Sequence, residues 1–302
     1  ELDLLDDCAV CCIGSTSQNA RMDDEYSRDH MWGPHLNFVL RDGKHASHGK
    51  SLMEAVASMP DEVDGVSWIG YDGPEPRRSG VWEETPFLRL VTGLNKPIDS
   101  EADWMKIVGR NGFLGRQWTE RLFDATQGEV FHGDWFESTW RDWTKYVPES
   151  VQIALASRSS FRIWNAGPEY NLARLIDRND IVGARLSVFR MVDDVMDLGF
   201  TLSGKYVPSF KWRWRHFAGL SVFTSDLVRR VEALTSVGAA VDMLRLARDI
   251  ELEIKSVLMD RFQPNCPSDA ELSRYAHEIR SKITSSNVRD WADLDWSVDL
   301  GI

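Results

Sequence analysis

The chain has 302 residues, of which 43% are hydrophobic, and carries a formal net charge of −12. This length is sufficient for a sizeable core in one large domain or two ordinary ones. The negative charge argues against a nucleic acid or an anionic membrane as the partner, because both require an extended basic surface. No apolar run approaches the roughly 18 residues of a membrane span, and no signal peptide is visible. We therefore expect a cytoplasmic protein, for which a small anionic substrate stays open.

The first 98 residues predict a small α/β domain with a mostly mixed sheet. The apolar run 9–13 predicts a buried strand that ends at Gly14. Further along this part of the chain, alternating or periodic apolar residues predict strands at 36–40, 63–71 and 81–84 and a helix at 46–59.

From residue 97 onwards the pattern is helical. Ser100 is expected to help cap a helix that carries Trp104 and Val108. Further helices are predicted at 115–126, 133–146, 148–166, 169–203 (interrupted near 179–183), 224–235, 238–261 and 268–284. The predicted organisation is thus an α/β domain over 1–98 and an all-α bundle over 99–302.

The chain is poor in cysteine, with four residues, and rich in tryptophan, with thirteen. Cys8, Cys11 and Cys12 have a metal-like spacing, but no second Cys/His pair follows at zinc-finger distance. Burial in the first strand is therefore favoured over zinc binding or redox chemistry. Many of the tryptophans must lie at domain contacts, in a substrate pocket or at a partner surface.

The stretch after the first strand is typical of the start of a nucleotidyltransferase fold. A strand, the Gly14-Ser15 turn and about a dozen residues precede Asp29 and the second strand. Glycine lets the backbone approach phosphate oxygens, and the N–H groups that follow point at the anion. In such folds a second carboxylate stands two residues after the first and shares its metal ions. Here Met31 takes that place.

Two strings in this stretch resemble a particular family. Residues 24–27 (DEYS) and 29–34 (DHMWGP) are similar to a poorly characterised bacterial family of nucleotidyltransferase-like proteins, whose hallmark is Asp-His-Asp-Trp-Gly-Pro-Arg. The resemblance covers roughly residues 10–220, and its downstream counterparts are Asp103–Trp104, Gly128–His132, Ala184–Leu198, Lys205–Pro208 and Lys211–Trp212. It implies a nucleotidyltransferase-fold domain, a C-terminal helical domain, a substrate between them and Mg²⁺-assisted nucleotide transfer.

The chain departs from that family at two positions, Met31 and His35, where the family has Asp and Arg. A thioether is a poor ligand for Mg²⁺, which prefers oxygen. Asp29 alone would hold an ion weakly. Mg²⁺ is therefore a candidate cofactor, and the sequence establishes no cofactor with certainty. A third carboxylate would have to come from Glu83 or Glu84, or less readily from Asp64 or Asp72, although solvated acids at strand edges and turns are the favoured interpretation of all four.

The anion-binding turn is expected to survive the loss of the second metal ligand. Gly14, Ser15 and Thr16 would bind a phosphate or sulfate group, with Arg21 and Arg28 nearby and with Lys211 and Trp212 from the helical domain. Asp29, aided by His30 and His35, would then orient or deprotonate an attacking amine or hydroxyl.

Three other clusters have competing interpretations. Basic and aromatic residues alternate at 211–216, but they are weak support for binding of single-stranded nucleic acid because the protein is acidic. They are expected instead either to face a substrate or to pack between the domains. His45 and His48 lack a third metal ligand nearby. Asp193, Asp194 and Asp197 either contact a cationic substrate group or form a solvated face.

These observations lead to three hypotheses. The first is a repurposed biosynthetic enzyme that binds an anionic leaving group and promotes intramolecular displacement or cyclisation. The second is a Mg²⁺-dependent nucleotidyltransferase that modifies a small molecule. The third is a non-catalytic protein that binds a nucleotide, or a protein partner through its Trp-rich surface.

Overall fold

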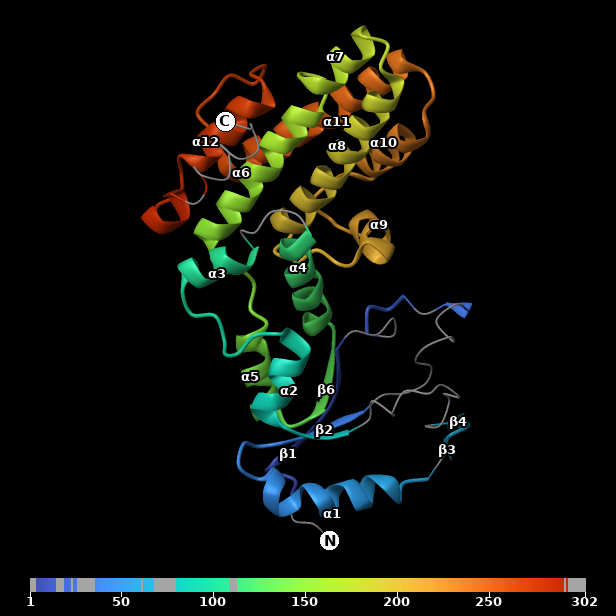
Figure 1. Cartoon of the computed structure of the whole chain (residues 1–302), viewed down its shortest axis with the longest axis vertical. Coiled ribbons are helices and arrows are strands. Elements are labelled where there is room, and N and C mark those ends of the chain that lie inside the picture. The colour runs from blue at the N-terminus through green and yellow to red at the C-terminus, as the bar shows by residue number, and fades with distance from the viewer. Residues whose placement is uncertain are drawn as a thin grey trace. The chain divides into compact units, whose positions relative to one another are not determined.

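The computed structural model describes residues 4–14, 19–22, 24–25, 36–60, 62–67, 80–108, 113–290 and 292. Contacts divide the chain into two compact units (Figure 1). The first consists of Glu1–Asp99 and Gln117–Lys145, and the second of Ser100–Arg116 and Tyr146–Ile302. The first unit holds a small four-stranded sheet and the second is helical. The first boundary, after residue 99, lies close to the predicted division at residue 98. Segment 117–145, however, belongs to the first unit, whereas the sequence placed it in the helical domain.

The sheet of the first unit has the strand order β5-β2-β1-β6. Its strands are β1 (Cys8–Ile13), β2 (Asn37–Leu40), β5 (Gly80–Glu83) and β6 (Gly128–His132). Strand β1 pairs antiparallel with β2 and β6, whereas β2 and β5 are parallel. A parallel pair needs a crossover connection, which is supplied by α1 (His45–Ala57) and the small hairpin of β3 (Glu62–Val63) and β4 (Val66–Ser67).

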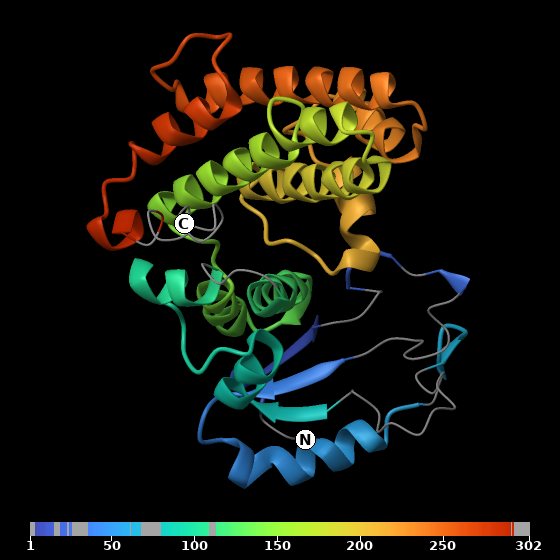
Figure 2. The ribbon, with the colours of Figure 1, turned by 45° about the horizontal axis from the view of Figure 1, so that its top comes forward.

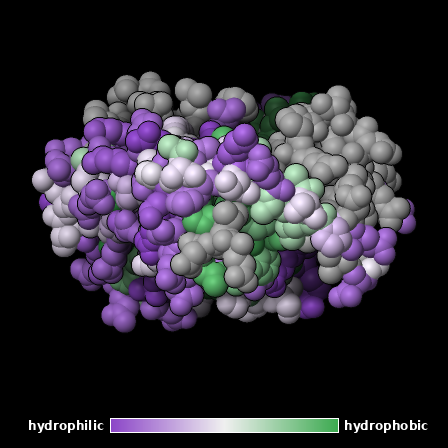
Figure 3. Space-filling view, turned by 90° about the horizontal axis from the view of Figure 1, so that it is seen from below, coloured by the Kyte–Doolittle hydropathy of each residue, from purple (hydrophilic) through white to green (hydrophobic). Residues whose placement is uncertain are grey.

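Helices cover both faces of this sheet (Figure 2). On one face Cys8, Leu40 and Val81 form a small core, with Leu52 and Val56 of α1 packed against it. On the other face lie α2 (Glu84–Thr92), α4 (Phe113–Thr126) and α5 (Asp134–Trp143). Side chains alternate between the faces of a strand, so that one short strand can serve both layers. In the space-filling view of Figure 3, the described side chains are mainly hydrophilic and a few apolar ones show between them.

Strand β6 corrects the prediction that the chain is helical throughout after residue 97. It is an edge strand whose residues are mostly exposed, so it lacks the alternation that predicts strands. Glycines flank it because the backbone passes very close to β1. A Cβ at Gly128 (φ +121°) would lie 2.1 Å from the carbonyl oxygen of Cys12, and one at Gly133 (φ +96°) 2.6 Å from Cβ of Ala9.

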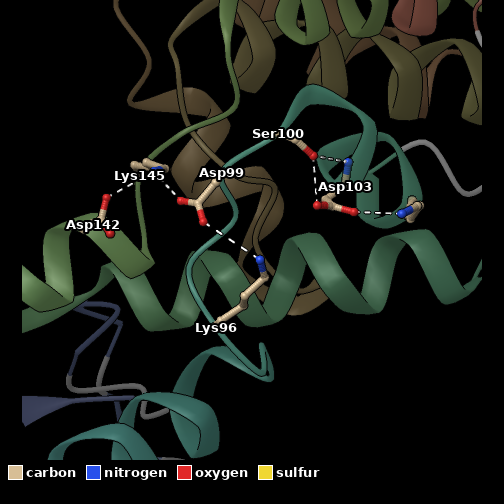
Figure 4. Close-up of polar contacts among 7 residues, drawn as sticks. Lys96, Asp99, Ser100, Asp103, Asp142 and Lys145 are labelled. Atoms are coloured by element: carbon tan, nitrogen blue, oxygen red, sulfur yellow. Dashed lines mark hydrogen bonds and ion pairs between the residues drawn. The ribbon is translucent and has the colours of Figure 1, made fainter.

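The chain passes between the two units after residues 99, 116 and 145, and ion pairs hold the first-unit ends of the first and last of these connections together (Figure 4). Asp99 pairs with Lys145 at 3.8 Å and with Lys96 at 4.0 Å, and Lys145 also pairs with Asp142 at 3.0 Å. Immediately after Asp99, the hydroxyl of Ser100 accepts a hydrogen bond from the N–H of Asp103. This bond confirms the predicted cap at the start of α3 (Glu101–Val108).

The second unit is built around one hydrophobic core. Helices α6 and α8 pack against each other, and α12 packs on α6. The helices of this bundle are α6 (Glu149–Ala166), α7 (Asn171–Asp177), α8 (Ile181–Leu202), α9 (Phe210–Ala218), α10 (Ser225–Ser236), α11 (Ala240–Phe262) and α12 (Leu272–Arg280). Among the described residues no helix is long and apolar enough to cross a membrane.

A buried charge cluster joins three parts of the bundle. Lys255 of α11 lies 2.7 Å from Oε1 of Glu169 and 3.0 Å from Oε1 of Glu251, while Glu169 also accepts the N–H of Leu272 at the start of α12. Burial raises the pKa of Glu251 to about 8, helped by its hydrogen bond to Glu169 and the negative charge there. The raised pKa favours the protonated form of Glu251, whereas the lowered pKa of Glu169 favours its ionised form beside Lys255.

Candidate functional site

A cavity of about 740 Å³ lies in the first unit beside the end of β1. All of its lining residues belong to that unit. They are Cys12, Ile13, Gly14, Asn19, Asn37, Trp82, Phe87, Leu90, Val91, Gln117, Glu120, Arg121 and Asp124. A cavity of this size falls within the range that small-molecule ligands occupy.

The cavity has an apolar side and a polar side. The apolar side chains come from β1, β5 and α2, and include those of Trp82, Leu90 and Val91. The polar side comes from one face of α4, where Gln117, Glu120, Arg121 and Asp124 recur at helical spacing. The guanidinium of Arg121 donates to the carbonyl of Leu90 at 2.5 Å and so links α4 to α2. Apolar walls with a few polar groups are typical of ligand sites.

The turn after β1 is the part of the cavity that the sequence predicted. Gly14 has φ +130°, a conformation that favours glycine over other residues. The side-chain amide of Asn19 donates to the carbonyl of Gly14 at 3.0 Å, and its oxygen accepts the thiol of Cys12 at 3.1 Å. This pair of bonds ties Asn19 to the end of β1.

The other predicted site residues have different outcomes. Arg21 is exposed, has φ +55° and is not part of the cavity lining. Lys211 and Trp212 lie on α9 in the second unit, with the Lys211 ammonium 5.3 Å from the Trp212 ring centre. The remaining predicted residues fall outside the described part of the chain, and their roles stay predictions: Ser15, Thr16, Arg28, Asp29, His30, Met31 and His35.

The described candidates for a third carboxylate, Glu83, Glu84 and Asp64, are not among the residues that line the cavity. Glu83 pairs with Leu40 in the β2–β5 register, three residues from the Asn37 end that lines the cavity, and its carboxylate accepts the N–H of Gly43 at 2.6 Å. Glu84 is half-buried at the start of α2, where burial raises its pKa. Asp64 is in the β3–β4 turn and Asp72 is outside the described residues. Structural roles therefore account for Glu83 and Glu84.

No group of three or more His, Cys, Asp or Glu side chains in the described part of the chain could hold a metal ion. His45 and His48 belong to α1, without a third described ligand. Cys8, Cys11 and Cys12 form no disulfide and are buried in β1, as predicted for Cys11 and Cys12, and burial raises the pKa of the Cys8 thiol to about 11. The described residues thus do not fit a two-metal clamp.

The acidic residues of α8 neither form a solvated face nor a simple acidic patch. Arg213 of α9 is buried, and its guanidinium lies 2.5 Å from the carboxylate of Asp193 and 3.8 Å from that of Asp197. This arrangement gives Arg213 a structural role, because a buried guanidinium needs such partners. Lys211 and Arg215, which flank it in the sequence, are exposed and both lie near the Trp212 ring.

Comparison with known proteins gives one finding. A family described as "Domain of unknown function (DUF4037)" matches residues 116–213. This match includes four segments on which the resemblance rested, Gly128–His132, Ala184–Leu198, Lys205–Pro208 and Lys211–Trp212. It begins within α4, contains β6 and α5 of the first unit and α6 to α8 of the second, and ends within α9 (Phe210–Ala218). No curated protein and no solved structure matches the chain.

Proposed function

We propose that this protein is a repurposed enzyme of the nucleotidyltransferase fold. It binds a small molecule through a phosphate or sulfate group at the Gly14 turn and promotes the intramolecular displacement of that group. The cavity that opens beside Gly14 is the observation that carries the proposal. The order of the strands also supports it, since β1 leads through the Gly14 turn to an antiparallel neighbour, β2, and β2 has a parallel neighbour, β5.

The proposed reaction needs no external reactant. An amine or hydroxyl of the substrate attacks the carbon that bears the phosphate or sulfate ester, and a C–N or C–O bond forms. The bond between that carbon and the ester oxygen breaks, and its electron pair leaves with the anion. The proton of the attacking group passes to the carboxylate of Asp29. Backbone N–H groups after Gly14 stabilise the charge that collects on the leaving anion.

The alternative function is Mg²⁺-dependent transfer of a nucleotide to a small molecule. The same strand order favours this function too, since the turn after β1 would then bind the nucleotide phosphates. Met31 is the residue that argues against it, because the second metal carboxylate is missing. We therefore rank it second.

The Gly14 turn is tested by replacing Gly14 with alanine. Among the described residues only Val91 has an atom within 4 Å of a Cβ at Gly14, at 3.9 Å, so that these residues leave room for it beside the cavity. The methyl group would nevertheless occupy the space of an anion held by the backbone. We expect Gly14→Ala to weaken the binding of inorganic phosphate or sulfate about tenfold, as measured by calorimetry, because a hydrogen bond to a charged group contributes about 1.5–3 kcal/mol.

Gly43→Ala is the matched control. Gly43 also has a positive φ, +83°, with no atom of the described residues within 4 Å of a new Cβ, and it lies in the turn after β2. Both variants therefore strain the backbone, but only Gly14→Ala changes the cavity. Equal phosphate affinity in the wild type and Gly14→Ala, or equal weakening in both variants, would contradict the proposed role of the turn.

A further inference from the structure

The indole of Trp82 is held in place by its neighbours in the sheet. Its Nε1–H donates to the side-chain oxygen of Asn37 at 3.0 Å, and Asn37 is itself buried in the first position of β2. Its ring also packs against Phe87 of α2, with 6.1 Å between the ring centres. The indole therefore needs little ordering when a ligand arrives, which reduces the entropic cost of binding.

Gly80 makes this position of the indole possible. Gly80 and Trp82 lie two residues apart in β5, on the same face of the sheet. A Cβ at Gly80 would lie 2.8 Å from Nε1 and 3.1 Å from Cε2 of the indole, closer than side-chain atoms pack. Only glycine at this position leaves the ring where it is.

The indole lines the same cavity as Gly14, and α4 contributes polar and charged side chains to that cavity. Leu90 and Val91 continue the apolar surface beside Trp82, whereas Glu120 and Asp124 belong to the polar side. Arg121 lies between these two acids on the same face, so that the formal charge of the three is −1; this side therefore disfavours an anion, and a substrate with its anionic group at Gly14 would extend its uncharged part along Trp82. Aromatic rings stack on one another more strongly than their buried area alone accounts for.

We propose that Trp82 is the stacking platform for a planar, unsaturated ring in the substrate. The proposal rests on the proposed function, because the ring must belong to the molecule whose anionic group lies at the Gly14 turn. It names the substrate class as an aryl or heteroaryl compound that carries a phosphate or sulfate ester. Asn37 and Gly80 are positioning residues, since both act through the indole.

The test compares three probes on the full-length chain by calorimetry: inorganic phosphate, cyclohexyl phosphate and phenyl phosphate. The two esters match in size and charge, and only phenyl phosphate has a planar ring. We expect phenyl phosphate to bind about tenfold more tightly than cyclohexyl phosphate. Trp82→Leu should abolish this preference without changing the affinity for inorganic phosphate, and Trp82→Phe should keep most of it.

A matched control and a second variant complete the design. Trp135→Leu removes another indole of the first unit that does not line the cavity, and it should leave the preference intact. Should Trp82→Leu fail to fold, Gly80→Ala decides, because the new methyl group displaces the indole and should reduce the preference. If inorganic phosphate binds but phenyl phosphate shows no advantage over cyclohexyl phosphate, stacking on Trp82 is overturned. If none of the three probes binds, the proposed function fails, and this inference fails with it.

Discussion

Replacing Asp29 by asparagine is expected to lower turnover by on the order of 100-fold or more, because an amide cannot accept the proton of the attacking group. Asp29 is outside the described residues, and its role comes from the motif that it begins. The measurement is the release of phosphate from aminoalkyl and hydroxyalkyl phosphate esters that the wild-type protein converts. Asparagine has nearly the same size as aspartate, so that ligand binding should persist while turnover falls.

Asp29→Glu and a phosphate titration provide the controls for this variant. A glutamate keeps the carboxylate and should restore part of the activity lost in Asp29→Asn. Equal phosphate affinity in all three proteins would show that the turn is intact. Unchanged turnover in Asp29→Asn would remove the proton acceptor from the mechanism and favour the hypothesis of a non-catalytic binding protein.

Replacing Glu251 by glutamine is expected to remove much of the dependence of stability on pH between about 5 and 8. The folded-state pKa of Glu251 is raised from 4.5 to about 8, so the native state binds one proton more than the unfolded state in this window. The contribution of Glu251 to stability is therefore complete below pH 4.5 and is lost as the pH rises through 8, by roughly 1 kcal/mol per pH unit.

Chemical denaturation at several pH values measures this effect. Glutamine keeps a hydrogen-bond donor for Glu169 and does not ionise. We expect Glu251→Gln to match the wild type within about 1 kcal/mol at pH 5 and to exceed it by on the order of 3 kcal/mol at pH 9. Glu232→Gln, at an exposed position of α10, should follow the wild-type curve. Parallel curves for the wild type and Glu251→Gln would contradict the buried, protonated state of Glu251.

Elements with strong burial periodicity could be predicted from the sequence. Strand β1 is an almost continuous buried run, and α6 and α11 repeat their buried residues at helical spacing. Helix α2 was missed because it begins directly after β5, and no polar break separates Glu83 from Glu84. The edge strand β6 was missed because its side chains are exposed. In both cases the tertiary neighbours, rather than the local pattern, determine the structure.

Only the local part of the candidate site could be predicted. Gly14 stood out because a glycine after a buried strand is a local signal. Trp82 and the polar residues of α4 reach the same cavity through strand pairing and packing between segments distant in the sequence, which no short motif records. The spacing of apolar residues at 115–126 did predict an amphipathic helix, but it did not show that the polar face of this helix lines a cavity. Likewise, the pairing of Asp193 with Arg213 joins α8 to α9 across twenty residues.

The most direct test of the central claim is a calorimetric titration of the purified protein with ATP, GTP, CTP and UTP, each with and without Mg²⁺, beside inorganic phosphate and sulfate. We expect phosphate or sulfate to bind without Mg²⁺, no nucleotide to gain affinity from the metal, and no pyrophosphate to be released. Tight, Mg²⁺-dependent binding of one nucleotide would contradict the claim. It would make nucleotide transfer the function of the Gly14 turn despite Met31.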